Sequence, residues 1–214
     1  MKRHDVMDET HLITPEMIIE GYRHGLFVMA QGRQGGIDWY HPDPRAVLPL
    51  EDFHISTSLR KRVQRGDYQI TCDTTFKQVI EACAAPRRYN ADTWINQEII
   101  TLYTQLHDLG LAHSFEAWRK IEEHDHDVQP YDLVGGLYGV ALGGAFFGES
   151  MFSHATDASK VCLVELVARL NCNGFTLCDV QFTSPYLNQF GVIEVPCNQY
   201  MQMLAEALPL ERQW

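Results

Sequence analysis

Two polar residues, Asp179 and Gln181, form the pair in this sequence that is best suited to chemistry. They stand two positions apart in an apolar segment, 175–182, that we expect to be a β-strand, so both side chains should point to the same face. Polar groups buried in this way need hydrogen-bond partners. A carboxylate can orient a carboxamide, and that carboxamide can hold or polarise a reacting group. A pair of structural hydrogen-bonding residues at the end of a sheet is the alternative that the strand alone leaves open.

A second candidate is Glu149, which follows a glycine-rich run of apolar residues at 133–148. Glycine weakens a strand, so repeated glycines indicate that a ligand or another backbone approaches closely. A carboxylate among apolar residues costs free energy unless a cation or hydrogen-bond donors meet it. The segment therefore predicts one wall of a site that accepts a cationic group. A glycine-rich hairpin with Glu149 turned toward water is the simpler alternative.

The sequence contains no convincing covalent nucleophile. Ser150 and Ser153 have no neighbouring histidine–aspartate pattern, and there is no Gly-x-Ser-x-Gly motif, P-loop or dinucleotide-binding fingerprint. The six cysteines form no Cys-x-x-Cys pair and lie among apolar residues, which is typical of reduced core thiols. The acidic, histidine-rich segment 121–132 is expected to be a solvated hairpin loop. We therefore expect catalysis by positioning and hydrogen bonding, without a metal or a cofactor.

Charge is distributed unevenly along the chain. The net charge of −11 disfavours general attraction to nucleic acid, but residues 1–65 carry nine basic and nine acidic residues and are neutral. This neutral part contains four cations in six residues that could bind phosphates, Arg60, Lys61, Arg62 and Arg65. Aromatic residues can stack an unpaired base, and the candidates are Trp39, Tyr40, Trp94 and Tyr103. A solvated helix face and ordinary core aromatics are the alternatives.

Start and stop signals divide the chain into the elements of an α+β protein. Thr14 can cap a first helix, Ser56 can cap a short basic helix over 57–65, and Gly66 ends that pattern. Residues 37–50 look extended. The strands expected further on are near 68–72, 112–118, 132–140, 143–148, 175–182 and 192–195, and the helices are near 75–83, 95–109, 157–171 and 198–207.

We place a domain boundary at Gly66, between a small N-terminal α/β domain over 1–66 and a catalytic domain over 67–214. The second part is similar in outline to the acetyltransferase-like (GNAT-like) mixed-sheet fold. No apolar run approaches the roughly 20 residues of a membrane span, and the N-terminus has no hydrophobic signal core. A cytoplasmic enzyme is therefore the expectation.

Taken together, these segments resemble the leucyl/phenylalanyl-tRNA–protein transferase family. Nine strings match the family's motifs in the family's order across about residues 12–207, and nine in order are far more specific than any one of them. The strings lie at 22–27, 39–45, 53–56, 92–95, 110–114, 134–139, 147–153, 158–160 and 179–181.

The resemblance implies a small N-terminal domain joined to an acetyltransferase-like catalytic domain. It implies an enzyme that moves Leu or Phe, with Met a further candidate, from aminoacyl-tRNA to the α-amino group of proteins that begin with Arg or Lys. This transfer marks those proteins for degradation by the N-end rule pathway. The implied partners are Leu-tRNA, Phe-tRNA and the acceptor proteins, with no cofactor and no membrane.

The resemblance also implies roles for individual residues. Asp179 and Gln181 would be the catalytic pair, and Glu149 would contact the acceptor peptide. The implied pocket for the aminoacyl side chain consists of Leu137, Phe146, Met151 and Leu163. The residues implied to surround the 3′-terminal adenosine of the tRNA are Trp39, Trp94 and Tyr103.

The sequence departs from the family pattern at 183–187, where Thr-Ser-Pro-Tyr-Leu replaces a string of the Thr-Asp/Glu-His-Leu type, and in the longer acidic loop at 121–132. Two other functions compete with the implied one. A CoA-dependent N-acyltransferase would need a glycine-rich turn for pyrophosphate, but the nearest candidate, 153–158, has no glycine and carries an acid. A non-catalytic tRNA-binding module would explain the aromatic residues and the basic helix but not Asp179 and Gln181.

Overall fold

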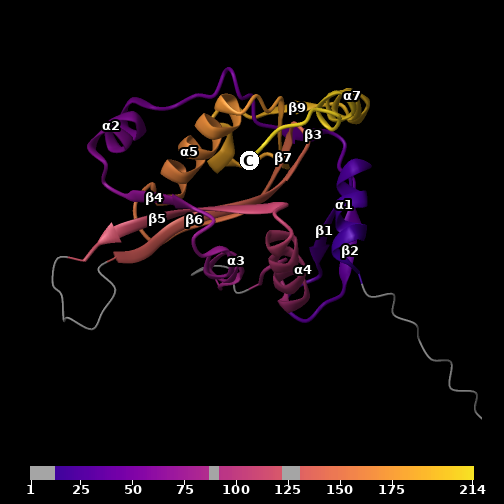
Figure 1. The fold of residues 1–214 in the computed structure, drawn as a ribbon, viewed down its shortest axis with the longest axis horizontal. Coiled ribbons are helices and arrows are strands. Elements are labelled where there is room, and N and C mark those ends of the chain that lie inside the picture. The colour runs from indigo at the N-terminus through magenta and orange to yellow at the C-terminus, as the bar shows by residue number, and fades with distance from the viewer. Residues whose placement is uncertain (1–12, 87–91, 122–130) are drawn as a thin grey trace, which may run out of the picture.

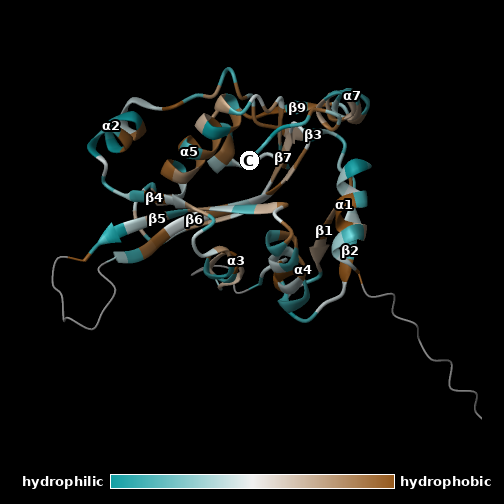
Figure 2. Ribbon diagram, viewed as in Figure 1, coloured by the Kyte–Doolittle hydropathy of each residue, from teal (hydrophilic) through white to brown (hydrophobic). Residues whose placement is uncertain are grey.

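A mixed β-sheet with helices on both of its faces forms the body of the protein (Figure 1). Helix α5 (Ala158–Cys172) covers one face, and α3 (Phe76–Ala84) and α4 (Gln97–Asp108) cover the other. Buried apolar side chains form two clusters, one under α5 and one under α3 and α4. The helices accordingly turn their hydrophobic residues to the sheet and their hydrophilic residues outward (Figure 2).

The computed structural model describes residues 13–86, 92–121 and 131–214. The remaining helices are α1 (Pro15–Arg23), α2 (Thr57–Arg65), α6 (Pro185–Asn188) and α7 (Cys197–Ala207). The strands are β1 (Phe27–Ala30), β2 (Ile37–Tyr40), β3 (Arg45–Val47), β4 (Gln69–Cys72), β5 (Ala112–Lys120), β6 (Tyr131–Leu142), β7 (Ala145–Ser153), β8 (Leu177–Gln181) and β9 (Ile193–Val195).

The seven strands of the main sheet run in the order β4-β5-β6-β7-β8-β3-β9, and β1 and β2 form a separate two-stranded sheet. Neighbouring strands are antiparallel except β7 and β8, which are parallel and are connected through α5. The parallel pairing covers only 145–147 against 177–179, whereas β7 continues to Ser153 alongside β6. The two parallel strands therefore separate at their carboxyl ends and open the sheet there.

Most of the expected elements are present and begin within two residues of the predicted position. The side chains of Thr14 and Ser56 accept hydrogen bonds from backbone N–H groups in the first turns of α1 and α2, as N-caps do. Strand β7 is longer than predicted, because it continues past Gly148. Strand β1 was not predicted, and the extended segment over 37–50 proved to be two short strands. The loop predicted between β5 and β6 lies largely outside the described residues, although the two strands pair as a hairpin.

Strand β3 belongs to the main sheet although it precedes the boundary predicted at Gly66. It lies between β8 and β9, both of which follow that boundary in the sequence. The division of the chain into two domains at this residue stays a prediction. None of the helices in the described part of the chain is long and apolar enough to cross a membrane.

A buried ion pair holds β3 in this position. Arg45 is only 1% exposed and donates to both carboxylate oxygens of Asp179 in β8, with Nε–Oδ1 at 2.9 Å and Nη2–Oδ2 at 2.6 Å. Its Nη1 donates to the carbonyl oxygen of Gly25, and Tyr200 of α7 donates to Asp179 Oδ2 at 2.8 Å. The guanidinium also lies over the rings of Phe27 and Tyr200. The pair thus fastens the N-terminal segment, the sheet and the last helix at one point.

We predict that Arg45→Met lowers the free energy of unfolding by about 3–5 kcal/mol, because it leaves the Asp179 carboxylate buried without its cation. The exposed pair between Arg65 and Asp67 supplies the control, since solvent screens it and Arg65→Met should have a far smaller effect. Urea titration followed by circular dichroism measures both variants. A loss for Arg45→Met no larger than that for the control would show that this pair does not hold the fold.

Candidate active site

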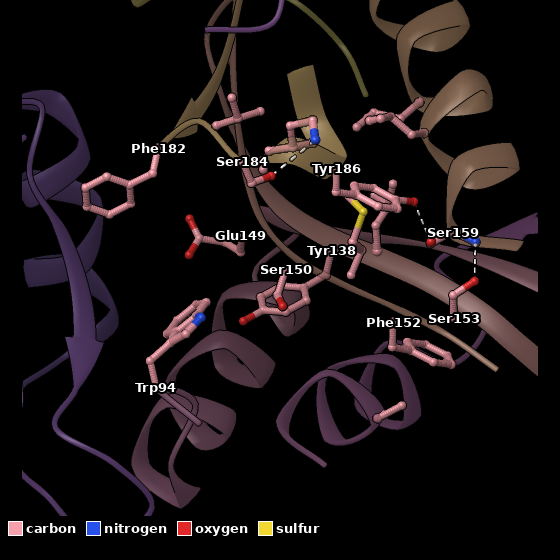
Figure 3. Close-up of a pocket in the computed structure, with 18 of the residues that line it drawn as sticks. Trp94, Tyr138, Glu149, Ser150, Phe152, Ser153, Ser159, Phe182, Ser184 and Tyr186 are labelled. Carbon is pink, nitrogen blue, oxygen red and sulfur yellow. Dashed lines mark hydrogen bonds between the residues drawn. The ribbon is translucent and has the colours of Figure 1, made fainter. Parts of the chain in front are cut away.

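A cavity of about 800 Å³ lies where β7 and β8 separate (Figure 3). Its walls come from β7 beyond Gly148, from the residues that follow β8, and from Leu163 and Leu166 of α5. Trp94, which precedes α4, lines another side. Both faces of the sheet contribute to the cavity because the gap between two separating strands is open to both. Ligand sites in sheets of this kind commonly lie at the carboxyl ends of parallel strands.

Glu149 reaches the cavity because β7 contains a β-bulge at this residue. Tyr138 of β6 pairs with Ser150, and the next residue, Gly139, pairs with Gly148, so Glu149 is the extra residue of β7. A bulge redirects a side chain that regular alternation would place elsewhere, and bulges are common beside active sites. The carboxylate of Glu149 accordingly lines the cavity (Figure 3).

Two tyrosine hydroxyls bind the Glu149 carboxylate. Tyr22 of α1 donates to Oε1 at 2.5 Å, Tyr103 of α4 donates to Oε2 at 3.2 Å, and the two hydroxyls are 2.6 Å apart. No residue in the described ranges forms an ion pair with Glu149. Burial raises the pKa of Glu149 to about 7, and the two hydrogen bonds only partly oppose this rise. Glu149 therefore changes its charge near neutral pH.

Asp179 and Gln181 are connected through the backbone. The pairing of β3 with β8 shifts register at Val180, and Gln181 has a positive φ of 57°. The backbone N–H of Gln181 donates to Asp179 Oδ1 at 2.9 Å, which holds the backbone in this conformation. The bulge breaks the two-residue alternation on which the predicted shared face depended. Strained backbone of this kind is found preferentially at functional sites.

The side chains of Asp179 and Gln181 differ in how many of their polar atoms have hydrogen-bond partners. The Asp179 carboxylate is completely buried and accepts from Arg45, Tyr200 and the Gln181 backbone, so its oxygens are well satisfied. The Gln181 Nε2 atom is buried and has no hydrogen-bond partner within the part of the chain that the structure describes. A buried donor without a partner costs free energy. Neither Asp179 nor Gln181 is among the residues that line the cavity, although the neighbours of Gln181 in the chain, Val180 and Phe182, are.

Three of the four residues predicted for the aminoacyl pocket, Leu137, Met151 and Leu163, line the cavity. Phe146 does not, because it is fully buried behind this wall and its ring stacks on Trp214 with the centroids 5.3 Å apart. The structure thus groups three apolar side chains at one part of the cavity and leaves the fourth behind them.

The three aromatic residues predicted for the tRNA terminus lie in different surroundings. Trp94 lines the cavity, and Tyr103 is buried beneath it as a partner of Glu149. The Trp39 ring packs so closely on Gly21 that a Cβ added there would lie 2.2 Å from it, and Trp39 is absent from the residues that line the cavity. The structure therefore brings Trp94 and Tyr103 to Glu149 but leaves Trp39 elsewhere.

The basic residues of α2 are not equivalent. Arg62 pairs with Asp67 and Asp157, and Arg65 pairs with Asp67. Two further members of the predicted phosphate-binding group are exposed and form no ion pair with any residue that the structure describes, and these are Arg60 and Lys61. Arg60 and Lys61 can therefore bind an external anion without competition from an ion pair within the described part of the chain.

The departure from the family pattern at 183–187 forms part of the cavity wall. Ser184 caps the short helix α6, and its side chain accepts from the Leu187 N–H at 3.1 Å. The Tyr186 hydroxyl lies 2.8 Å from Ser159 Oγ of α5 (Figure 3). This string therefore builds its own hydrogen-bonded wall in place of the residues that the family pattern has there.

Sequence reasoning missed three residues that shape the site. Tyr22 looked like an ordinary core residue of the first helix, and only its hydroxyl partner shows its connection to Glu149. Arg45 is the last residue of the string at 39–45 that resembles the family, and a lone arginine between a proline and an apolar run was its signal in the sequence. Phe182, adjacent to Gln181, lines the cavity but was counted as part of an apolar strand.

The mixed sheet thus encloses a cavity whose described lining combines the Glu149 carboxylate with a group of apolar side chains. A model of the family described as leucyl/phenylalanyl-tRNA protein transferase matches residues 47–205. A relative of that name from Rubrobacter xylanophilus is 50% identical over 200 residues, which are 94% of this chain and 97% of the relative. Another from Salinibacter ruber is 47% identical over 202 residues, 94% of this chain and 83% of the relative. The chain belongs to the leucyl/phenylalanyl-tRNA–protein transferase family.

A solved structure titled the structure of L-PGS from Bacillus licheniformis resembles the fold more distantly. The TM-score is 0.46 at 12% sequence identity, over 90% of this chain and 70% of that one. A similarity of this degree supports no statement about function.

We predict that Glu149 makes the protein less stable as the pH rises from about 4.5 to about 7. An unperturbed glutamate has a pKa of 4.5, whereas Glu149 in the folded protein has a pKa of about 7, so deprotonation favours the unfolded chain across this window. Glu149→Gln removes this effect. The free energy of unfolding of the variant, relative to the wild type, should rise with pH by about 3 kcal/mol at most. Urea titrations at half-unit pH steps measure it, and a difference that stays constant would contradict the raised pKa.

Proposed function

We propose that this chain transfers Leu or Phe, with Met a further candidate, from aminoacyl-tRNA to the α-amino group of proteins that begin with Arg or Lys. Family membership supports the reaction, since the relatives carry the name leucyl/phenylalanyl-tRNA–protein transferase. The observation that carries the proposal is the cavity itself, where Glu149 can receive a cation and three apolar side chains can receive an apolar group. Marking proteins for the N-end rule pathway would follow from the transfer, and the cytoplasm is the compartment that charged tRNA implies.

The proposed reaction is the aminolysis of an ester. The α-amine of the acceptor attacks the ester carbonyl carbon, a C–N bond forms, and the C–O bond to the terminal ribose breaks. The amine loses a proton and the ribose oxygen gains one, so the reaction is redox-neutral. An ester is already activated toward amines, so the protein must mainly orient the two reactants and stabilise the charge that develops on the carbonyl oxygen.

Gln181 and Asp179 would divide this work. The Gln181 carboxamide has an unpartnered N–H donor next to two residues of the cavity lining, Val180 and Phe182, and it would turn toward the cavity to donate to an ester carbonyl. Asp179 is saturated by internal donors, so we assign it the positioning of Gln181 through the backbone amide. This assignment keeps the orienting role that the sequence predicted for the carboxylate, now exerted through the Gln181 backbone.

The remaining proposed contacts are those with the acceptor's first residue and with the tRNA. Glu149 would meet the cationic first residue of the acceptor, and Trp94 would stack on the terminal adenosine of the tRNA with Tyr103 beneath. Arg60 and Lys61 would contact the phosphates. The parallel pair β7–β8, which separates at the cavity, supports an acetyltransferase-like description of the main sheet. Trp39 has no support from the geometry beyond its partial exposure.

The CoA-dependent alternative is disfavoured by the start of α5. Asp157 stands at the N-cap with φ 62° and pairs with Arg62 and Lys160, both at 3.1 Å. A carboxylate at this helix start would repel a pyrophosphate, which such enzymes bind at a helix N-terminus. The aminoacyl-tRNA donor needs no such turn.

The proposal is tested by offering the protein Phe-tRNA or phenylalanyl-CoA together with a peptide that begins with Arg. We expect labelled Phe to reach the peptide only from the tRNA. Gln181→Ala should lower kcat about 10²–10³-fold, as the loss of a transition-state hydrogen bond does. Transfer from acyl-CoA would favour the CoA-dependent enzyme, and tight tRNA binding without any transfer would favour a non-catalytic module. The kcat of Asp179→Asn is measured in the same assay. The free energy of unfolding of this variant is measured as well, because the substitution also disturbs the ion pair with Arg45.

We predict that the three apolar lining residues set the preference between Leu and Phe. Met151→Ala should favour Phe-tRNA by enlarging the pocket, and Leu163→Phe should favour Leu-tRNA by narrowing it. One methylene is worth about 1–3 kcal/mol of discrimination, so the kcat/KM ratio should change about tenfold. Leu109→Ala is the control, since this exposed residue is remote from the cavity lining. Folded variants with the wild-type ratio would remove these residues from the pocket.

A further inference from the structure

Phe182 is an aromatic residue whose apolar ring stays partly exposed to solvent, which costs free energy. It follows β8 directly after Gln181, lines the cavity and is 47% exposed. Its ring packs edge-on against Phe27, with the centroids 5.7 Å apart and the planes at 79°. A large apolar side chain that stays open inside a cavity is typical of a ligand contact, because burial against a partner would stabilise it.

Phe182 and Trp94 lie on two sides of the Glu149 carboxylate (Figure 3). Glu149 receives its two hydrogen bonds from tyrosines and forms no ion pair with any residue in the described ranges. An occupant that completes this arrangement must bring a positive charge for the carboxylate. It must also tolerate, or be attracted by, the electron-rich face of an aromatic ring.

The same chain already contains the completed form of this arrangement. The Arg45 guanidinium pairs with the Asp179 carboxylate while it lies 4.9 Å from the ring centroid of Phe27 and 4.5 Å from that of Tyr200. Phe27 is also the ring against which Phe182 packs. A carboxylate that accepts from tyrosine and lies near two aromatic rings thus occurs twice. At Asp179, Tyr200 supplies both the hydroxyl and one of the rings around the Arg45 cation, whereas at Glu149 the hydroxyls come from Tyr22 and Tyr103.

We propose that Phe182 is a specificity-determining residue, whose ring receives the cationic side chain of the acceptor's first residue while Glu149 pairs with the charge. This inference rests on the proposed function. Phe182 would be the residue by which the enzyme prefers an acceptor with a guanidinium or ammonium group over one with a neutral side chain of similar shape. Stacking of a tRNA base on Phe182 is the competing occupant. Glu149 favours the cation, since a carboxylate has no charge to neutralise in a base.

The test compares acceptor peptides that begin with Arg or with citrulline, its uncharged isostere, in Phe182→Leu, Phe182→Trp and the wild type. We expect Phe182→Leu to lower the ratio of kcat/KM for the Arg peptide to that for the citrulline peptide about 2- to 30-fold, the range of a cation–π contact. Phe182→Trp should keep or raise the ratio, because indole binds cations best. The Lys and norleucine peptides repeat the comparison with an ammonium group.

The control is Tyr131→Leu, which makes the same kind of change at an exposed aromatic residue outside this cavity, and its ratio should be unchanged. Equal losses on the Arg and citrulline peptides would overturn the inference, since a merely apolar wall acts on both. Weaker tRNA binding with an unchanged ratio would also overturn it, in favour of a stacked base. Calorimetric binding of the same peptides separates the two proposals. If Phe is transferred but Phe182→Leu leaves the ratio of kcat/KM for the Arg and citrulline peptides unchanged, only this inference is wrong. If the protein binds the Arg peptide more tightly than the citrulline peptide, in a way that depends on Phe182, but transfers no Phe, only the proposed function is wrong.

Discussion

The pairing of Arg45 with Asp179 is the interaction on which the site depends. Two charges removed from water cost more free energy than their attraction returns unless every donor and acceptor is used. Here both Asp179 oxygens and all three donating nitrogens of Arg45 have partners, from Gly25, Tyr200 and the Gln181 backbone as well as from each other. The requirement to satisfy this pair draws β3, β8, α7 and the segment after α1 to one point. It also fixes the positive φ of the residue that we propose to be catalytic.

Two β-bulges, one in β7 and one in β8, shape the candidate site. One, at Glu149, turns a carboxylate of β7 into the cavity, and the other, at Val180, changes the direction of β8 just as it leaves its parallel partner. A regular sheet would have kept these strands together and filled the space between them with side chains. The cavity therefore lies where the parallel pairing ends, and Glu149 faces it because the alternation of side chains is interrupted in β7.

The electrostatic consequence is that two carboxylates in one region have different roles. Asp179 has its counter-cation built in, so it can act as a fixed anchor. Among the described residues, the hydrogen-bond partners of Glu149 are two neutral phenols, and burial raises its pKa to about 7, so its charge depends on what enters the cavity. An incoming cation would stabilise the ionised form, which couples acceptor binding to deprotonation of Glu149. The surroundings of the two carboxylates, and not their chemical type, thus make Asp179 an anchor and leave Glu149 as the acid that we propose to bind the acceptor.

Local sequence was enough to predict most of the elements and the family. Caps at Thr14 and Ser56, the apolar faces of the helices and the ordered motifs act over a few residues, where spacing dictates geometry. Which groups meet depends instead on the tertiary structure. Arg45 and Asp179 are 134 residues apart and Tyr22 and Glu149 are 127 apart, so nothing local pairs them. The fold also placed Phe146 behind the cavity wall, Trp39 against Gly21 and Phe182 inside the cavity, because the register of β7 and β8 and the packing around them set these positions. Register and bulges depend on the partner strand, which the residues of one strand do not specify.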